Sequence, residues 1–467
     1  MVQGSSLIRP RTVTGDGAGL VSHAGIAWLA ETADLAGLTR GLSMAMSKVP
    51  QRRHDPGRTL AQMVLALADG ATCLSDLAAI RSQSSMFGAV ASEATVWRTF
   101  DQIGSVELRG IAAARAGARE RAWSAGAGPA TDELIIDFDA TLINTKADKQ
   151  DARPNYKRGY GHHPLLAIIA ETDEVLTAKL RPGNAGSNTA VDHVSVLADA
   201  LDQLPAQWRA GHDVGDDPND VEHRVLVRAD AGGASHWFAE ECVDRNLDYS
   251  FGFHIDHRVR DGVTMIPTGC WHPAIDSGGC RRDGADVVEL TDFVDLTNWP
   301  TGTRLIVRRE RPHPGAQLSL FDTVEGFRHT AFITNQTSFD VAALELQQRQ
   351  RARAENVIRD AKACGLTNLP FDDIVNNDVW MNLCFAANDL LGWAQRIGCV
   401  GQLQRATPKT IRHRMLHVAA RITPNSRRLR LDHDWPWTTI ILDAIHRVRT
   451  AFQALTVITD PSTQAAL

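Results

Sequence analysis

The stretch LIIDFDATLINT, residues 134–145, decides which folds this chain can adopt. It begins with a short apolar run that is typical of a buried strand, and the two-residue repeat of an extended chain then places Asp137 and Asp139 on one face. Two acids on one strand face rarely serve packing, because a buried charge without a partner is costly. The stretch therefore predicts a carboxylate with a chemical role at the end of a buried strand.

The order of elements after this stretch predicts an α/β fold with a ribonuclease H-like catalytic domain. Two more strands follow directly, and helices then alternate with strands. The predicted elements span 163–171, 174–181, 189–204, 224–231, 235–247 and 248–255. Upstream of the Gly- and Pro-containing link at 124–133, the apolar spacing is that of helices.

Changes of composition and periodicity predict five regions. They are an N-terminal helical DNA-binding domain at 1–128, the first part of the catalytic domain at 129–255, a β-rich insertion at 256–337, the second part of the catalytic domain at 338–398 and a helical, basic C-terminal region at 399–467.

Two helix starts are predicted from capping residues. Ser92 precedes a short helix that carries Thr95, Trp97 and Arg98, a pattern compatible with a helix-turn-helix and almost equally with a plain helical bundle. Ser338 is the expected cap of one long helix that Gly365 ends.

The composition excludes several classes of protein. The 467 residues are 43% hydrophobic and 22% charged, without an apolar run long enough for a membrane span or a secretory signal. Seven scattered cysteines without a CxxC pair favour a reducing compartment, so we expect a cytoplasmic protein, and association with the nucleoid would follow only if it binds DNA. Cys270, His272 and Cys280 are close enough for zinc, but a fourth ligand is not evident.

The net charge of −6 argues against nucleic acid, but the charges are unevenly distributed. Residues 401–431 contain eight Lys and Arg and no Asp or Glu. A solvated basic face and a phosphate-binding stripe explain this segment about equally well. If it binds DNA, Arg412, Arg414, Arg427 and Arg428 are the expected contacts, although some of them can instead bond to helix ends of the protein itself.

Two further acids complete a possible set. Asp230 follows the apolar run of the strand at 224–231, where a turn residue is the alternative interpretation. On the long helix, Arg351, Glu355 and Arg359 are spaced by four and Lys362 lies seven beyond Glu355, which places all four on one face. An exposed ion-pair ladder has the same spacing.

Together these motifs resemble the DDE transposases of bacterial insertion sequences, specifically the thirteen-eighty insertion-sequence family of a hairpin-forming clan. Asp139-Ala140-Thr141 is similar to the first motif, and residues 228–232, RADAG, to the second. The third motif has Tyr, two residues, Arg, three residues, Glu, six residues and Lys. Arg351, Glu355 and Lys362 match it, whereas Gln348 stands at the Tyr position.

The resemblance implies a cut-and-paste DNA transposase that binds the inverted repeats at the ends of its element. Asp139, Asp230 and Glu355 would be catalytic and would bind two Mg²⁺ ions, which Mn²⁺ can replace, with Asp137 in a supporting position or as an alternative ligand. Double-stranded DNA and a homodimer are the implied partners. The implied phosphate-binding residues are Arg351, Arg359, Lys362, Lys146, Lys157, Arg158 and the basic stretch, and Trp271 or Trp299 would stack a flipped base.

Two alternatives remain. A transposase-derived DNA-binding protein that has lost catalysis would keep the helical and basic regions. The motif DFDATL, residues 137–142, also resembles the first motif of haloacid dehalogenase-like phosphatases. Their later acidic motif has only a weak counterpart at 371–378, which lacks its glycine.

Overall fold

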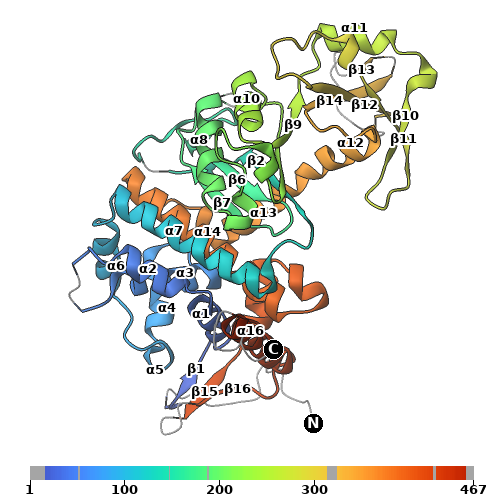
Figure 1. Cartoon of the computed structure of the whole chain (residues 1–467). Helices are drawn as coiled ribbons and strands as arrows, with labels where there is room; N and C mark the ends of the chain where they lie inside the picture. The colour runs from blue at the N-terminus through green and yellow to red at the C-terminus, as the bar shows by residue number, and fades with distance from the viewer. Residues whose placement is uncertain are drawn as a thin grey trace, which may run out of the picture.

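The computed structural model describes residues 16–50, 53–146, 148–186, 189–312, 323–324, 326–423 and 428–458. Its centre is a large mixed sheet (Figure 1). The strand of the opening stretch, β2 (Glu133–Ala140), pairs antiparallel with β6 (Leu165–Ile169) on one side and parallel with β8 (Arg224–Ala229) on the other. β7 (Val175–Lys179) and β9 (Asp248–Phe253) extend the sheet outward, which gives the order β7-β6-β2-β8-β9. All five predicted strands are therefore present and neighbours in one sheet.

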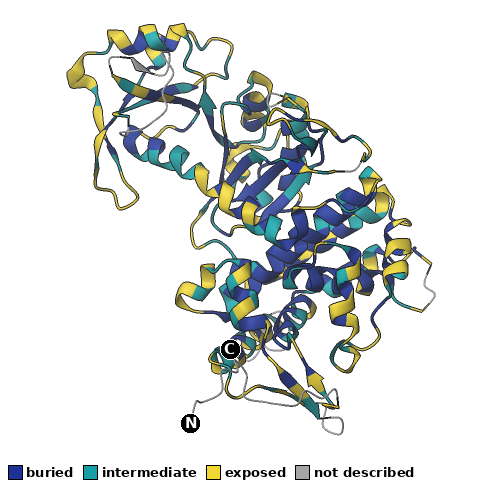
Figure 2. Ribbon diagram, turned by 180° about the vertical axis from the view of Figure 1, so that it is seen from behind, coloured by how far each residue is buried: buried dark blue, intermediate teal, exposed yellow. Residues whose placement is uncertain are grey.

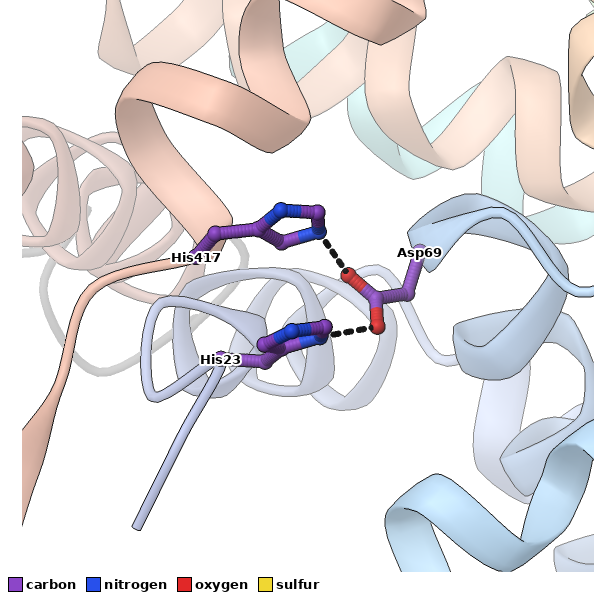
Figure 3. A group of neighbouring side chains, drawn as sticks. All are labelled: His23, Asp69 and His417. Atoms are coloured by element: carbon purple, nitrogen blue, oxygen red, sulfur yellow. Dashed lines mark hydrogen bonds and ion pairs between the residues drawn. The ribbon is translucent and has the colours of Figure 1, made fainter.

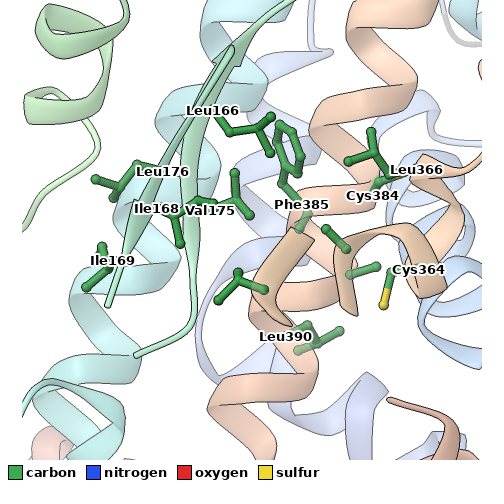
Figure 4. Close-up of a cluster of buried hydrophobic side chains, with 14 of the residues drawn as sticks. Leu166, Ile168, Ile169, Val175, Leu176, Cys364, Leu366, Cys384, Phe385 and Leu390 are labelled. Atoms are coloured by element: carbon green, nitrogen blue, oxygen red, sulfur yellow. The ribbon is translucent and has the colours of Figure 1, made fainter. Parts of the chain in front are cut away.

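Helices cover both faces of this sheet. α8 (Ala190–Leu201) and α10 (His236–Asp244) pack against each other and against strands β6, β7 and β9. On the other face, α14 (Ile374–Gly398) presents Phe385 and Leu390 to the apolar side chains of β6 and β7 (Figure 4). Figure 2 shows the consequence, because the strands at the centre and α14 are dark blue, the colour of buried residues.

The β-rich segment continues this sheet through backbone pairing. β14 (Phe327–Thr334) pairs antiparallel with β9, with Ala331 opposite Phe253. The remaining strands follow outward and, with α11, form the lobe at the upper right of Figure 1: β12 (Arg304–Glu310), β11 (Arg281–Glu289), β10 (His272–Ile275), the short β13 (Thr323–Val324) and α11 (His257–Met265). The lobe has a small core of its own, which includes Ile306, Phe332 and Leu344.

The single long helix predicted after this segment is wrong in two respects. It starts at Asp340, whose carboxylate accepts from the amides of residues 342 and 343, and not at Ser338. It is also broken into α12 (Val341–Arg349), a 3-10 turn (Gln350–Arg353), α13 (Ala354–Ala361) and a π turn (Lys362–Leu366). The predicted end is confirmed, since Gly365 has a φ of 102°, which favours glycine.

The helices near both ends of the chain pack as one layer. α3 (Pro56–Asp69) contacts α14, and α1 (Ile26–Leu35) contacts α14 and α16 (Thr438–Ile458). The other N-terminal helices are α2 (Leu38–Ala45), α4 (Ala78–Arg81), α5 (Ser84–Phe87), α6 (Glu93–Phe100) and α7 (Ser105–Ala122). Ser92 precedes α6 as predicted, but its hydroxyl contacts that of Thr95 and does not cap a backbone amide.

The first described strand lies beside the C-terminal segment. β1 (Leu20–Val21) pairs with β15 (Ala420–Thr423), which pairs with β16 (Arg428–Leu431), so part of the predicted helical C-terminal region is a small sheet. The remaining short elements are β3 (Ile143–Asn144), β4 (Arg153–Pro154), β5 (Tyr160–His162), α9 (Ala206–Arg209) and α15 (Pro408–Ile411).

A buried ionic cluster joins the N-terminal helices to the sheet. Arg115 and Arg119 of α7 both donate to Asp389 of α14, each at 2.9 Å. Arg119 also donates to Glu174 at 2.7 Å, just before β7, and Glu174 accepts from the indole of Trp393. Because all four charges are buried and paired, this cluster ties three elements in one arrangement.

In the described part of the chain, no single helix has the length and apolar character needed to cross a membrane. The helical segments α3 and 74–81, which meet at a sharp bend, have that length and apolar character only when they are taken together. Residues 56–68 of α3 are almost all buried within the protein.

Candidate active site

Asp139 lies near the end of β2, on the face that α12 and the following 3-10 turn cover. Its carboxylate accepts from the amide of Ala140 at 2.9 Å and lies 3.7 Å from the guanidinium of Arg351. Burial raises the pKa of Asp139, Arg351 opposes that shift, and the nearby charges of Asp230 and Glu355 add to it. Asp230 and Glu355 therefore both lie within electrostatic range of Asp139.

The position of Asp230 follows from strand register. Phe138 of β2 is opposite Ala229 of β8, and the two strands are parallel, so the residues after them leave the sheet at one edge. The Asp230 carboxylate accepts from the amides of Gly232 and Gly233, at 2.9 and 3.2 Å. A side chain on Gly233, the residue after the motif, would meet the Ala229 side chain at 2.6 Å, so the close packing here favours glycine.

Glu355 lies in the first turn of α13 and is exposed. Arg351, in the 3-10 turn before it, lies 3.7 Å from Asp139, and the charge of Glu355 also acts on the Asp139 carboxylate. Lys362 also turns toward β2, where its ammonium donates to the carbonyl of Leu142 at 3.3 Å. Burial lowers the pKa of Lys362, and the charge of Lys157 adds to that shift.

Asp137 shares the face of Asp139 but has a different environment. It is 1% exposed, and Arg228 donates to both of its oxygens, at 2.7 and 2.8 Å. Burial raises the pKa of Asp137, and the two hydrogen bonds from Arg228 oppose that shift. This pairing does not favour the alternative role of Asp137 as a metal ligand, because both of its oxygens already accept from a buried cation. A supporting role beside Asp139 fits the structure.

Gln348 stands at the position where the family that this chain resembles has Tyr, and its side chain links two strands. Its amide nitrogen donates to the carbonyl of Ala229 at 3.1 Å, and its oxygen accepts from the hydroxyl of Ser250 at 2.8 Å. It thus holds the end of β8, immediately before Asp230, against β9. The sequence indicated the departure from the motif but not this role.

The other cations predicted near the site are differently placed. Lys157, Arg158 and Lys146 are exposed in the segment that follows β2. Arg359 does not join Arg351 and Lys362, since it is exposed and contacts Asn356 and Asp360.

One cation of the basic stretch, Arg412, bonds to a helix end of the protein itself, the alternative allowed for some of the four arginines. The guanidinium of Arg412 donates to the carbonyls of Leu67, Ala68 and Ala363, at 3.3, 2.7 and 2.9 Å. It thereby satisfies the C-terminal end of α3 and is not available to DNA. Arg414 is half-buried against Trp437, Arg428 is exposed on β16, and Arg427 lies outside the described residues.

The two candidate tryptophans lie in different parts of the β-rich segment. Trp271 packs under the guanidinium of Arg309, 4.2 Å from its ring centre, on the outer strands. Trp299 contacts His236, the first residue of α10, with ring centres 4.4 Å apart. Trp299 therefore contacts α10, which begins six residues after Asp230 along the chain. Cys270, His272 and Cys280 are exposed, and they do not form a ligand group among the described residues.

The family model for the group 1 transposase DDE domain matches residues 7–453. The chain belongs to the DDE transposase family. This membership identifies a transposase and decides against the phosphatase interpretation of the motif at 137–142. The fold of this DDE transposase is also similar to the cryo-EM structure of the piggyBac transposase synaptic complex with hairpin DNA, with a TM-score of 0.41, 10% identity, and coverage of 91% of this chain and 85% of that chain. No curated protein matches it.

Proposed function

We propose that this transposase binds the ends of its element and performs metal-dependent strand cleavage and strand transfer with Asp139, Asp230 and Glu355. The observation that carries the proposal is the convergence of these three acids at one edge of the sheet, beside Arg351. The strand order β7-β6-β2-β8-β9 supports a ribonuclease H-like catalytic domain. Membership of the thirteen-eighty insertion-sequence family, a bacterial cytoplasmic setting and a homodimer on paired DNA ends belong to the same proposal.

The three acids fit hard divalent cations. Carboxylate oxygens are the ligands that Mg²⁺ and Mn²⁺ prefer. Burial raises the pKa of Asp139 and the charges of Asp230 and Glu355 add to that shift, so a cation between the acids would favour their ionised forms. Asp139, Asp230 and Glu355 would hold the ions. When bound, a pair of Mg²⁺ ions supplies activation of the attacking oxygen and stabilisation of the leaving oxygen.

The cations around the acids would hold the DNA backbone. One terminal nitrogen of Arg351, Nη1, is buried and has no hydrogen-bond partner among the described residues, although it lies 3.7 Å from Asp139. A phosphate oxygen is the partner that such a group lacks, since a guanidinium binds phosphate well. Lys362 and Lys157, whose charge acts on Lys362, would contact neighbouring phosphates.

A basic ribbon at the C-terminal end supports DNA binding outside the catalytic domain. Arg421 of β15 is directly opposite Arg430 of β16, and Arg428 is two residues before Arg430, so the three share one face. All three are exposed. Like charges in opposed positions weaken strand pairing, so an anionic partner such as the phosphate backbone accounts for this arrangement.

The N-terminal helices contribute a second cationic surface. A pocket of about 500 Å³ beside α6 is lined by Arg53, His54, Arg81 and Arg98, and by no acidic residue. Trp97, next to Arg98, is 50% exposed. This pocket supports a DNA-binding role for the N-terminal helices. Trp299 is the residue that we propose for stacking a flipped base.

The decisive experiment measures cleavage of DNA that carries the ends of the element, in the presence of Mg²⁺. We expect Asp139→Ala, Asp230→Ala and Glu355→Ala each to lower the rate of strand cleavage by more than about 100-fold, because each removes a metal ligand. Loss of a residue that only hydrogen-bonds to a metal ligand typically lowers activity by about 10- to 100-fold, and loss of the ligand itself should have a larger effect. Binding of the ends should persist. Asp283→Ala, which removes an exposed acid of β11, is the matched control and should cleave normally. Normal cleavage by any of the three variants would exclude that residue from the site, and absence of cleavage by the wild type would favour a lapsed DNA-binding protein.

A further inference from the structure

Three side chains from distant parts of the sequence meet away from the catalytic acids. His23 lies between β1 and α1, Asp69 is the last residue of α3, and His417 precedes β15. Figure 3 shows both rings directed at the Asp69 carboxylate. His23 Nδ1 lies 2.6 Å from one carboxylate oxygen and His417 Nε2 lies 3.1 Å from the other.

We propose that His23, Asp69 and His417 form a binding site for a borderline transition-metal ion such as Zn²⁺. Two imidazole nitrogens and one carboxylate oxygen are a ligand set that suits Zn²⁺, Co²⁺ or Ni²⁺, and it differs from the oxygen-only set that suits Mg²⁺. The site uses none of the elements that carry Asp139, Asp230 and Glu355. The inference therefore does not depend on the proposed transposition chemistry.

The distances suit one ion. The three ligand atoms all lie within 4.8 Å of one another. A tetrahedral Zn²⁺ with bonds of about 2.0 Å keeps its ligands roughly 3.3 Å apart, so small side-chain shifts are sufficient. The two rings are stacked, with centres 3.9 Å apart and planes inclined by 18°, and hence their nitrogens approach the carboxylate from one side.

The surrounding backbone holds the three ligands in place. Ala24 and Gly25 donate to the carbonyls of Val418 and Leu416, at 2.9 and 3.1 Å, so the chain beside His23 pairs with the chain around His417. A side chain on Gly25 would lie 1.8 Å from the carbonyl of Met415, which requires glycine here. His23 itself has a φ of 53°, a left-handed conformation that is uncommon for a residue with a side chain.

The electrostatic environment of Asp69 also favours a cation. The carboxylate is at the C-terminal end of α3, where the helix dipole is negative and an acid is unfavourable. Its side chain is only 9% exposed, whereas those of His23 and His417 are 35% and 36% exposed. A metal ion can thus enter from the histidine side, and water can complete its coordination.

A metal ion bound to these three residues would link segments near both ends of the described chain. The ligands belong to the segment that leads into α1, to the end of α3 and to the segment that leads into β15. A bound ion would fasten these three segments, in addition to the β1–β15 pairing, and would stabilise the folded chain by mass action.

The test is titration of the full-length protein with Co²⁺ in excess Mg²⁺, followed by its visible absorption spectrum, with Zn²⁺ competition. We expect one Co²⁺ per chain in a nitrogen-containing site, displaced by Zn²⁺, and an increase in melting temperature on addition of Zn²⁺. His417→Gln and His23→Asn should each weaken binding by more than about 100-fold, since a direct ligand is lost. His433→Gln, which alters a fully exposed histidine of the same region, and Asp139→Ala should bind as the wild type does.

Three results would overturn the proposal. They are absence of Co²⁺ and Zn²⁺ binding in the wild type, unchanged binding by folded His417→Gln or His23→Asn, and loss of binding in Asp139→Ala. If His417→Gln does not fold, His23→Asn and the wild-type titration still decide. Asn is chosen at position 23 because it tolerates the left-handed backbone better than most residues.

Discussion

At the scale of single residues, Asp137 and Asp139 show how two acids on one strand face acquire different roles. Asp139 lies at the strand end beside Arg351 at 3.7 Å, a separation too long for a hydrogen bond. Both carboxylate oxygens of Asp137, two residues earlier, accept short hydrogen bonds from Arg228. Both acids follow the same apolar run, so their different roles arise from where their arginine partners lie.

The first prediction concerns the buried pair. Asp137→Asn should lower the free energy of unfolding by about 3–5 kcal/mol, because it leaves the buried Arg228 guanidinium without its counter-charge. The measurement is equilibrium unfolding in denaturant. Asp248→Asn is the control, since it breaks the pair with the exposed Arg224 near the opposite end of β8 and should cost no more than about 1 kcal/mol.

If the two variants lose similar free energies of unfolding, burial of the Asp137–Arg228 pair does not increase its contribution to stability. Strand cleavage should also fall less in Asp137→Asn than in Asp139→Ala, provided that both are assayed below their unfolding temperatures. Equal loss of cleavage would restore Asp137 as a candidate ligand.

A second residue, Glu171, makes stability depend on pH. Burial raises its pKa to about 7, and its carboxylate accepts from the amide of Ile135 in β2 at 3.0 Å. The folded chain therefore holds a proton that the unfolded chain releases near its ordinary pKa of 4.5. Stability from this group is present below pH 4.5 and is lost as the pH rises through about 7.

We accordingly expect Glu171→Gln to gain stability relative to the wild type as the pH increases across that window. Gln keeps an acceptor for Ile135 and cannot ionise. Denaturant unfolding at several pH values tests this, and a constant difference between the two proteins would contradict it. Asp378, whose pKa burial also raises to about 7, is unchanged in both and contributes equally.

At the scale of elements, the basic stretch divides into structural and exposed cations. Arg412 satisfies carbonyls at the end of α3, whereas Arg421, Arg428 and Arg430 share the exposed face of the β15–β16 ribbon. Sequence counting treats all of these as equivalent. Only the strand pairing shows which of them are available to a partner.

The ribbon gives a prediction about salt dependence. Changing Arg421, Arg428 and Arg430 together to Gln should lower the slope of log affinity for DNA against log salt by up to about 2.7, because each lost phosphate contact removes about 0.9. We expect a decrease of at least about 1, with little change in preference for the element's ends over random DNA, since phosphate contacts carry no sequence information.

The control carries the same change of charge elsewhere, with Arg40, Arg109 and Arg224, all exposed, replaced by Gln. Equal slopes for the ribbon variant and the wild type would show that the arginines of the ribbon do not contact DNA phosphates and only form a solvated face. A decrease of the same size in the control would indicate an effect of net charge alone.

At the scale of the whole molecule, the N-terminal helices, the sheet and the C-terminal helices share one main core. The buried cluster of Arg115, Arg119, Glu174 and Asp389 lies where α7, the β6–β7 connection and α14 meet. The N-terminal helices and the sheet should therefore unfold together, although the sequence suggests separate regions.

Asp389→Asn tests this cooperativity. It leaves two buried guanidinium groups with too little negative charge, so we expect a loss of about 3–5 kcal/mol in unfolding free energy. Hydrogen exchange should accelerate in α7 and in the central strands alike. Asp213→Asn, which breaks an exposed pair with Arg209, should leave exchange unchanged. Faster exchange confined to α7 would show that the helices and the sheet are independent units.

The sequence by itself determined the local elements and the three acids. Apolar runs and glycines are local patterns, and they were sufficient to predict the five central strands and the end of the broken helix at Gly365, whereas Asp139, Asp230 and Glu355 were expected as one set because their motifs resemble those of DDE transposases. The family model confirms the transposase interpretation. Local patterns succeed here because strand alternation and turn residues depend on neighbours along the chain.

Only the tertiary structure decided which charges are paired. Arg228 binds Asp137 across two strands, Arg412 reaches α3 from 344 residues away, and His23, Asp69 and His417 meet from three distant segments. Arg359 likewise contacts Asn356 and Asp360 on its own helix. These contacts depend on strand register and helix packing, and sequence spacing carries no information about groups that only folding brings together.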